Sequence, residues 1–240
     1  MRNGGVVGAL TRINASLDRI EQRQMAALAG MEESYDVKAR RIRGVLSELG
    51  VDVGKNSGLE AARGMGGPLI PPRVAADTAT FERQLQRISS ARTHVSRLSR
   101  ALGNVPLRKP VDAEIDLVSA FGVRNDPFTG SPAMHTGIDL HGSPGDPARA
   151  TAEGTVTAAG WSGGYGRVVD VDHGNGISTR YAHLSSIEVH VGQGVKAGQI
   201  VGRIGSTGRS TGPHLHYETR VKGEPVDPHK FLRAGTRLDL

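Results

Sequence analysis

The sequence contains no cysteine, a composition that permits an oxidising compartment without requiring one. Aromatic residues make up only 4% of the 240 residues, which is little for one large core and fits a chain with an extended helical part. No apolar run reaches about 18 residues, so the sequence predicts no transmembrane helix. The first five residues are not followed by the apolar stretch of a secretory signal. If the protein works outside the cytoplasm, we expect its export signal or membrane anchor to be missing from this chain.

The net charge of +6 is unevenly distributed along the chain. Residues 1–110 carry 18 Lys and Arg against 10 Asp and Glu, a net charge of +8, whereas residues 111–240 carry 12 against 14, a net charge of −2. A basic half can indicate a nucleic-acid partner or an acidic surface. Here the Arg residues are scattered and no aromatic residues are interleaved for base stacking, so we interpret them as a solvated helical face and expect no nucleic-acid partner.

The first half of the chain predicts a long helix at residues 6–49. Its apolar residues recur three and four positions apart, as at Leu10, Ile13, Leu17 and Ile20. A narrow apolar stripe on a charged helix is typical of a coiled coil.

A segment rich in Gly and Pro at 51–74 interrupts this pattern and predicts a connector. A second striped helix is expected at 77–102, so residues 1–104 form a helical coiled-coil region in this interpretation. Two such helices favour an antiparallel hairpin, with pairing between separate chains as the alternative.

The second half, residues 105–240, has a different character that begins beyond Pro106 and Pro110. Short β-rich runs separated by glycine predict a mostly antiparallel all-β domain of sandwich or barrel type. The expected strands are Ile115–Ala120, Gly154–Gly160, Arg167–Asp172, Ile177–His183, Ile187–Val191, Gln199–Ile204 and Leu215–Val221. The predicted fold class is therefore α+β multidomain, a helical hairpin followed by a β-domain.

Candidate metal ligands lie in two places about eighty residues apart. His214 and His216 would share one face of a strand, since side chains two apart point the same way. His135 and Asp139 would lie roughly 13 Å apart in a flat strand, too far to share an ion, but Gly137 lets the chain bend. Catalytic zinc usually has three protein ligands and one open position, so one of these four is surplus and available for proton chemistry. A further candidate is His183 in the run Tyr181–Leu184.

A series of motifs over nearly half the chain resembles the M23 family of zinc metallopeptidases, of the lysostaphin and LytM type. The motifs occur in the family's order: Phe121–Arg124 (FGVR), His135–Asp139 (HTGID), Gly164–Gly166 (GYG), Asp172–Gly176 (DHGNG), Tyr181–Leu184 (YAHL), Gly205–Gly208 (GSTG) and Ser210–Glu218 (STGPHLHYE). A lone His-x-His would be weak evidence, whereas the whole series is specific.

The resemblance implies a β-domain with zinc at the floor of a groove. It implies His135, Asp139 and His216 as metal ligands and His183 and His214 as catalytic histidines. No His-Glu-x-x-His motif is present, so the two non-ligand imidazoles must handle the protons and the oxyanion. Which histidine does which is open, and Tyr165 is a weaker candidate for a groove wall or an added oxyanion donor.

The resemblance further implies a zinc-dependent endopeptidase that cuts peptide cross-links of bacterial peptidoglycan in the periplasm or cell envelope. The alternative is a non-catalytic M23-type domain that activates another cell-wall hydrolase. Because hydrolysis requires none of residues 1–110, we expect them to regulate the groove, to bind an envelope partner or to self-associate. The sequence does not distinguish which peptidoglycan bond is cut.

Overall fold

The computed structural model describes residues 3–51, 76–112 and 114–238 and divides into two compact units. The first unit comprises residues 1–44 and 57–99, and the second comprises residues 45–56 and 100–240. The predicted boundary between residues 104 and 105 stays a prediction.

The first unit contains the two predicted helices, α1 (Asn3–Glu48) and α2 (Ala76–Gly103), apart from the last four residues of each, which belong to the second unit. Buried apolar residues occur at helical spacing on both, with Ala39 and Ile42 on α1 and Ile88, Val95 and Leu98 on α2. A charged contact joins the two helices, because Arg87 Nε on α2 donates to Glu32 Oε1 on α1 at 3.1 Å. The prediction of a long N-terminal helix is confirmed.

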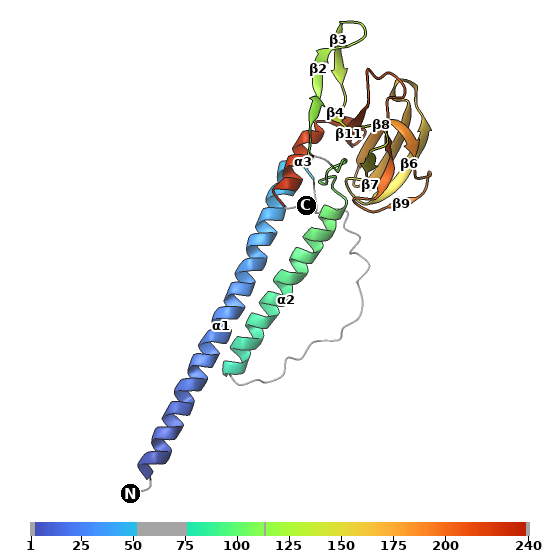
Figure 1. Ribbon diagram of the computed structural model, residues 1–240. Coiled ribbons are helices and arrows are strands. Elements are labelled where there is room, and N and C mark those ends of the chain that lie inside the picture. Colours follow the sequence, from blue (N-terminus) through green and yellow to red (C-terminus); the bar gives the residue numbers. More distant parts are fainter. Residues whose placement is uncertain (1–2, 52–75, 113, 239–240) are drawn as a thin grey trace. The chain divides into compact units, whose positions relative to one another are not determined.

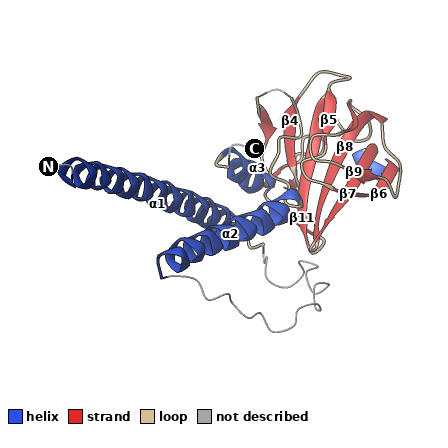
Figure 2. Cartoon of the chain, turned by 90° about the horizontal axis from the view of Figure 1, so that it is seen from below, coloured by secondary structure: helices blue, strands red, loops and turns tan. Residues whose placement is uncertain are grey.

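The two helices run in the same direction in both ribbon views (Figures 1 and 2), so the predicted antiparallel hairpin is wrong. A short turn would force antiparallel neighbours, but residues 49–75 separate these helices. A segment of that length can span the roughly 42 Å of α2, a helix of 28 residues rising 1.5 Å each. The predicted connector at 51–74 lies outside the described residues apart from Val51.

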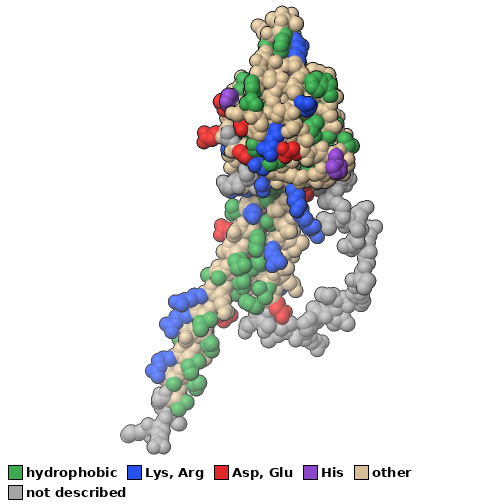
Figure 3. All heavy atoms as spheres, turned by 45° about the vertical axis from the view of Figure 1, so that its right-hand side comes forward, with side chains coloured by type: hydrophobic (Ala, Val, Ile, Leu, Met, Phe, Trp, Pro, Cys, Tyr) green, Lys and Arg blue, Asp and Glu red, His purple; other side chains and the backbone are tan. Residues whose placement is uncertain are grey.

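The apolar stripe at the start of α1 is about half exposed in this chain. Leu10, Ile13, Leu17 and Ile20 are 48–56% exposed. Figure 3 shows apolar side chains along the surface of this helix, with Lys and Arg side chains along its other edge. The coiled coil itself stays a prediction. Within the described residues, no helix is both long enough and apolar enough to cross a bilayer.

The second unit is built on a ten-stranded sheet whose strand pairs are all antiparallel, which confirms the predicted β-domain. Its main path runs β1-β4-β11-β8-β7-β6-β9, with β10 on β8 and β5, and β12 on β11. The strands β2 and β3 form a separate hairpin (Figure 1). The bounds are β1 Leu117–Ser119, β2 Gly122–Asn125, β3 Pro132–His135, β4 Ile138–His141, β5 Pro147–Arg149, β6 Gly154–Trp161, β7 Arg167–Gly174, β8 Ile177–Ile187, β9 Gly194–Val195, β10 Ile200–Ile204, β11 His214–Val221 and β12 Glu224–Val226.

Two expectations about this unit need correction. The run Ile187–Val191 is not a strand of its own, because β8 continues through Ile187 for 11 residues in all. The sequence reading also missed a C-terminal helix, α3 (Pro228–Thr236). Its signals are local: Asp227 caps the helix by accepting a hydrogen bond from the His229 amide, and Pro228 occupies the first turn.

The hydrophobic core lies against one face of the central strands and leaves the other face free for chemistry. On β11, Leu215 and Tyr217 are completely buried in this core. The alternate residues His214, His216 and Glu218 point to the opposite face because side chains alternate along a strand. Because β11 lies between β4 and β8, all three strands contribute to this second face of the sheet.

Candidate active site

Strand pairing brings two of the candidate ligands side by side. His216 on β11 is paired with Asp139 on β4, and on its other side with Ala182 on β8. Directly paired residues in an antiparallel sheet have Cβ atoms about 5 Å apart. His183 follows Ala182 with a positive φ of 59°, which breaks the regular alternation of the strand, and its ring centre lies 5.7 Å from that of His216.

The third ligand candidate, His135, is brought to the site by the expected bend of the chain. Strand β3 ends at His135 and β4 begins at Ile138, so the two residues between them turn the backbone. His135 Nε2 and Asp139 Oδ1 consequently lie 3.1 Å apart. Gly137 is required here for space, since a Cβ atom would collide with the carbonyl oxygen of Tyr217 on β11.

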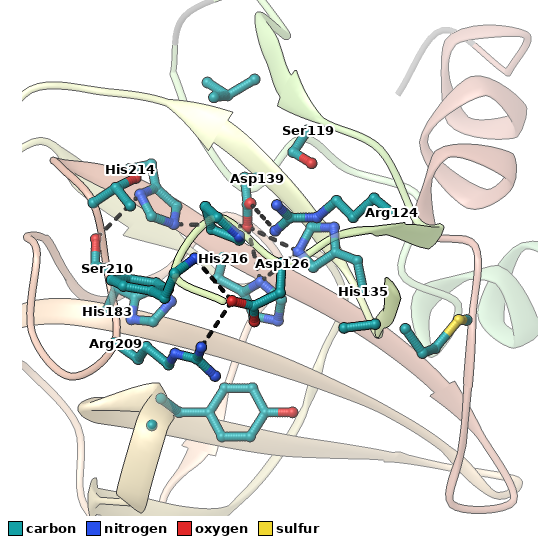
Figure 4. A pocket seen from close by; sticks show the side chains of 18 residues that line it. Ser119, Arg124, Asp126, His135, Asp139, His183, Arg209, Ser210, His214 and His216 are labelled. Atoms are coloured by element: carbon teal, nitrogen blue, oxygen red, sulfur yellow. Dashed lines mark hydrogen bonds and ion pairs between the residues drawn. The ribbon is translucent and has the colours of Figure 1, made fainter. Parts of the chain in front are cut away.

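His135, Asp139 and His216 point toward one another at the floor of a groove (Figure 4). His216 Nδ1 lies 2.9 Å from Asp139 Oδ1 and 3.1 Å from His135 Nε2. The ligand atoms of the three residues all lie within 4.8 Å of one another, and all three residues are buried. A fourth group, His214 Nε2, lies 3.7 Å from the same Asp139 oxygen.

The outer contacts of the two imidazoles determine which nitrogen carries the proton. His135 Nδ1 lies 2.7 Å from the carbonyl oxygen of Ala120, which only accepts, so Nδ1 is the donor. His216 Nε2 lies 3.1 Å from Glu218 Oε1 and donates to that carboxylate. In the neutral rings, the two nitrogens facing each other are both acceptors, and Asp139 adds an anionic oxygen. Three acceptors without a donor among them fit a bound cation, and two imidazoles with one carboxylate fit zinc.

The electrostatics of this group also favour an anionic carboxylate. Burial alone would raise the pKa of Asp139, but the hydrogen bonds that His135 and His216 donate when their rings are protonated outweigh it and hold that pKa far below its ordinary range. For His216, burial works to lower the pKa, and hydrogen bonds to Asp139 and Glu218 outweigh it and raise the pKa.

The remaining two histidines lie beside the three ligand candidates. The rings of His183 and His214 have centroids 4.9 Å apart. His183 Nδ1 donates to the carbonyl oxygen of Thr207 at 2.7 Å, and His214 Nδ1 donates to that of Gly212 at 2.7 Å. Each neutral ring therefore keeps Nε2 free to accept a proton. Burial lowers the pKa of His183 to about 4, against the opposing effect of its hydrogen bond to the backbone carbonyl of Thr207.

Glu218 is a site residue that the sequence reading quoted in a motif but gave no role. Its side chain is fully buried. Besides His216, its Oε1 accepts from Thr136 Oγ1 at 2.6 Å and from Tyr165 OH at 2.8 Å, and its Oε2 accepts from Arg220 Nε at 2.7 Å. The signal that could have found it is its even spacing from His216 on one strand face. Tyr165, considered as an oxyanion donor, has its hydroxyl committed to Glu218.

The groove above these residues has a volume of about 470 Å³. Its walls come from the β2–β3 hairpin on one side and the segment before β11 on the other. The two walls are joined where Arg209 Nη2 donates to Asp126 Oδ1 at 2.8 Å, with the guanidinium 4.6 Å from the centre of the Phe128 ring. We call this three-residue contact the wall clasp.

Comparison with known proteins identifies the family. Residues 133–228 match the model of Peptidase family M23. Over 110 residues the chain is 50% identical to the DD-carboxypeptidase/endopeptidase Mpg of Neisseria meningitidis serogroup B, covering 46% of this chain and 25% of that protein. It is 43% identical over 124 residues to the peptidoglycan DD-endopeptidase ShyA of Vibrio cholerae, covering 51% of this chain and 29% of that protein.

Among solved structures, the catalytic domain of lysostaphin from Staphylococcus simulans aligns with a TM-score of 0.46 and 36% identity, covering 50% of this chain and 92% of that one. The chain thus spans between a quarter and a third of the length of the curated relatives named here. The matched segment contains all five candidate site residues, His135, Asp139, His183, His214 and His216. Residues 133–228 belong to peptidase family M23, which confirms the resemblance.

Proposed function

We propose that this protein is a zinc-dependent endopeptidase that hydrolyses peptide cross-links of bacterial peptidoglycan. The observation that carries the proposal is the convergence of Asp139 Oδ1 and two bare imidazole nitrogens, from His135 and His216, at one point of the groove floor. Two further imidazoles lie beside that point.

The three converging residues would hold the metal, and zinc suits two imidazoles and a carboxylate. When bound, zinc supplies Lewis-acid polarisation of a peptide carbonyl and activation of a water molecule. Proton transfer is left to the side chains of the protein. His183 and His214 each present Nε2 toward the groove, so they supply the proton acceptor and the proton donor that peptide hydrolysis requires.

The substrate class comes from the relatives. ShyA is named a peptidoglycan DD-endopeptidase, and 124 residues of this chain are 43% identical to it. An open groove lined by charged and aromatic side chains fits a short, extended peptide. Peptidoglycan as the substrate implies action in the cell envelope.

The experiment combines metal analysis with digestion of purified peptidoglycan, followed by mass spectrometry of the released fragments. We expect about one zinc per chain and release of uncross-linked stem peptides. The matched control is His190→Ala, which removes an exposed histidine remote from the groove lining and should leave both results unchanged. Zinc-loaded protein that releases no fragments would favour a non-catalytic activator of another hydrolase.

We further propose that the helical unit regulates or positions the peptidase. A cell-wall hydrolase that is always open endangers its host, and the half-exposed stripe at the start of α1 offers a surface for an envelope partner or a second copy of this chain. The charges of +8 and −2 on the two halves of the chain add a weak attraction that salt would screen.

A further inference from the structure

The two oxygens of the Asp139 carboxylate have different surroundings. Oδ1 is the atom shared by His135 Nε2 at 3.1 Å and His216 Nδ1 at 2.9 Å. Oδ2 instead accepts a hydrogen bond from Arg124 Nη2 at 3.3 Å. The carboxylate is therefore divided, with one oxygen facing the candidate metal position and the other facing a permanent cation.

This division bears on how many coordination positions the carboxylate can fill. A carboxylate with both oxygens free can bind a metal through both, which would occupy the position that a catalytic zinc site keeps open. A guanidinium that holds one oxygen leaves only the other for the metal.

Arg124 is well placed for this task. It lies on β2, where it pairs with Ala133 on β3, so the same hairpin that supplies His135 also supplies the guanidinium. Figure 4 shows the side chain beside Asp139 and His135. Among the described residues its Nε is buried without a hydrogen-bond partner, so this nitrogen does not tie the guanidinium to another acceptor.

We propose that Arg124 is a positioning residue that keeps Asp139 a one-oxygen ligand and so preserves the open coordination position. The inference rests on the proposed metal site and adds a residue to it. This role differs from a general structural role of Arg124 in its consequences. Loss of a structural residue would alter folding or metal content, whereas loss of a positioning residue alters the coordination number of a metal that stays bound.

The test is Arg124→Met, which keeps the length of the side chain and removes every donor. The protein is loaded with Co²⁺, whose visible absorption is strongest in a four-coordinate site and weaker in a five-coordinate one. We expect Arg124→Met to bind about one Co²⁺ per chain with clearly weaker visible absorption than the wild type. We also expect the zinc form to lose activity by about 10- to 100-fold, the usual cost of removing a group that orients a metal ligand.

Two companion variants sharpen the result. Arg203→Met removes an arginine that pairs with Glu188 outside the groove, and it should leave the Co²⁺ spectrum unchanged. Arg124→Lys returns a cation with a donor to Oδ2 and should recover much of the absorption. A lysine variant indistinguishable from the methionine variant would contradict the proposal.

The remaining outcomes also decide the matter. An unchanged Co²⁺ spectrum in Arg124→Met overturns the inference and leaves the proposed function intact, whereas wild-type protein that binds no metal overturns the proposed function itself. If Arg124→Met does not fold, the crystal structure of the zinc-loaded wild type decides. A zinc ion about 2.0–2.2 Å from both Asp139 oxygens would refute the inference, and one at that distance from Oδ1 alone would support it.

Discussion

Glu218→Gln is the substitution whose effect the site geometry predicts most fully. Three donors converge on Glu218 Oε1, from His216, Thr136 and Tyr165, and Arg220 donates to Oε2. A glutamine offers one oxygen and one NH₂ group in their place. Whichever way the amide is turned, its NH₂ faces at least one donor, and the negative charge that strengthens the other contacts is gone.

The magnitude follows from the ionisation of Glu218. Burial would raise its pKa, but hydrogen bonds from His216, Thr136 and Arg220 lower the pKa from 4.5 to about 2. At about 1.4 kcal/mol per pKa unit, this shift corresponds to about 3 kcal/mol of folding stability. A depressed pKa stabilises the fold fully above the ordinary pKa, and the contribution is lost as the pH falls toward 2.

We therefore expect metal-free Glu218→Gln to unfold with a free energy about 3 kcal/mol smaller than that of the wild type at pH 7. The difference should shrink as the pH falls below about 5, because the unfolded wild type then takes up a proton on Glu218, whereas the folded protein does so only near pH 2. Urea titrations followed by circular dichroism, with a chelator present, measure both. The control is Glu188→Gln, whose partner Arg203 and own side chain are each 36% exposed, and it should cost less than about 1 kcal/mol. Equal stability of wild type and Glu218→Gln at pH 7 would refute the reasoning.

Four further outcomes are expected. His216→Ala should lose bound zinc and keep most of the fold, and full zinc occupancy in that variant would remove His216 from the ligands. His183→Ala and His214→Ala should each keep zinc and lose activity by roughly 10²-fold or more, and retained activity would reduce either histidine to a structural role. Asp126→Asn should weaken the wall clasp and change KM for peptide fragments more than kcat. A change in kcat alone would contradict a role of the wall clasp in groove shape. Cleaving an engineered protease site in the segment between α1 and α2 should speed peptidoglycan digestion if the helical unit covers the groove, and unchanged rates would leave it as a spacer or partner-binding element.

The sequence indicated the candidate side chains of the site far better than the hydrogen-bond partners that orient them. His135, Asp139, His214 and His216 were accessible as candidates because a period of two on a strand and a glycine between two ligands are visible in the residues themselves, whereas the roles of these four and of His183 came from the resemblance to the M23 family. The acceptors that orient three of the histidines are carbonyl oxygens of Ala120, Thr207 and Gly212, and a backbone carbonyl leaves no residue-type signal. Glu218 and Arg124 stood within quoted motifs, but their roles depend on side-chain contacts that spacing does not reveal.

The fold shows the same division between local and long-range information. Helical spacing predicted α1 and α2 to within three residues at each end, because the stripe of each helix is a local pattern. Their relative direction depends on how the chain returns between them, and composition alone does not fix it. In the β-domain, strands with continuous β-rich runs were predicted, whereas the short strands β2, β3 and β4 gain their pairing from neighbours distant in sequence.

The four histidines of the site share one arrangement, which explains why a single substitution can test it. Each has one nitrogen fixed by an acceptor, three of them by a backbone carbonyl and His216 by Glu218, and each turns its other nitrogen toward the groove. Backbone carbonyls cannot be removed by changing a side chain. Among these four acceptors, Glu218 alone can be replaced without moving the backbone, so Glu218→Gln weakens the acceptor of one imidazole while the other three keep theirs. A loss of metal affinity of about 10- to 100-fold in that variant, with the groove histidines unchanged, would therefore measure what the charged acceptor behind His216 contributes to binding.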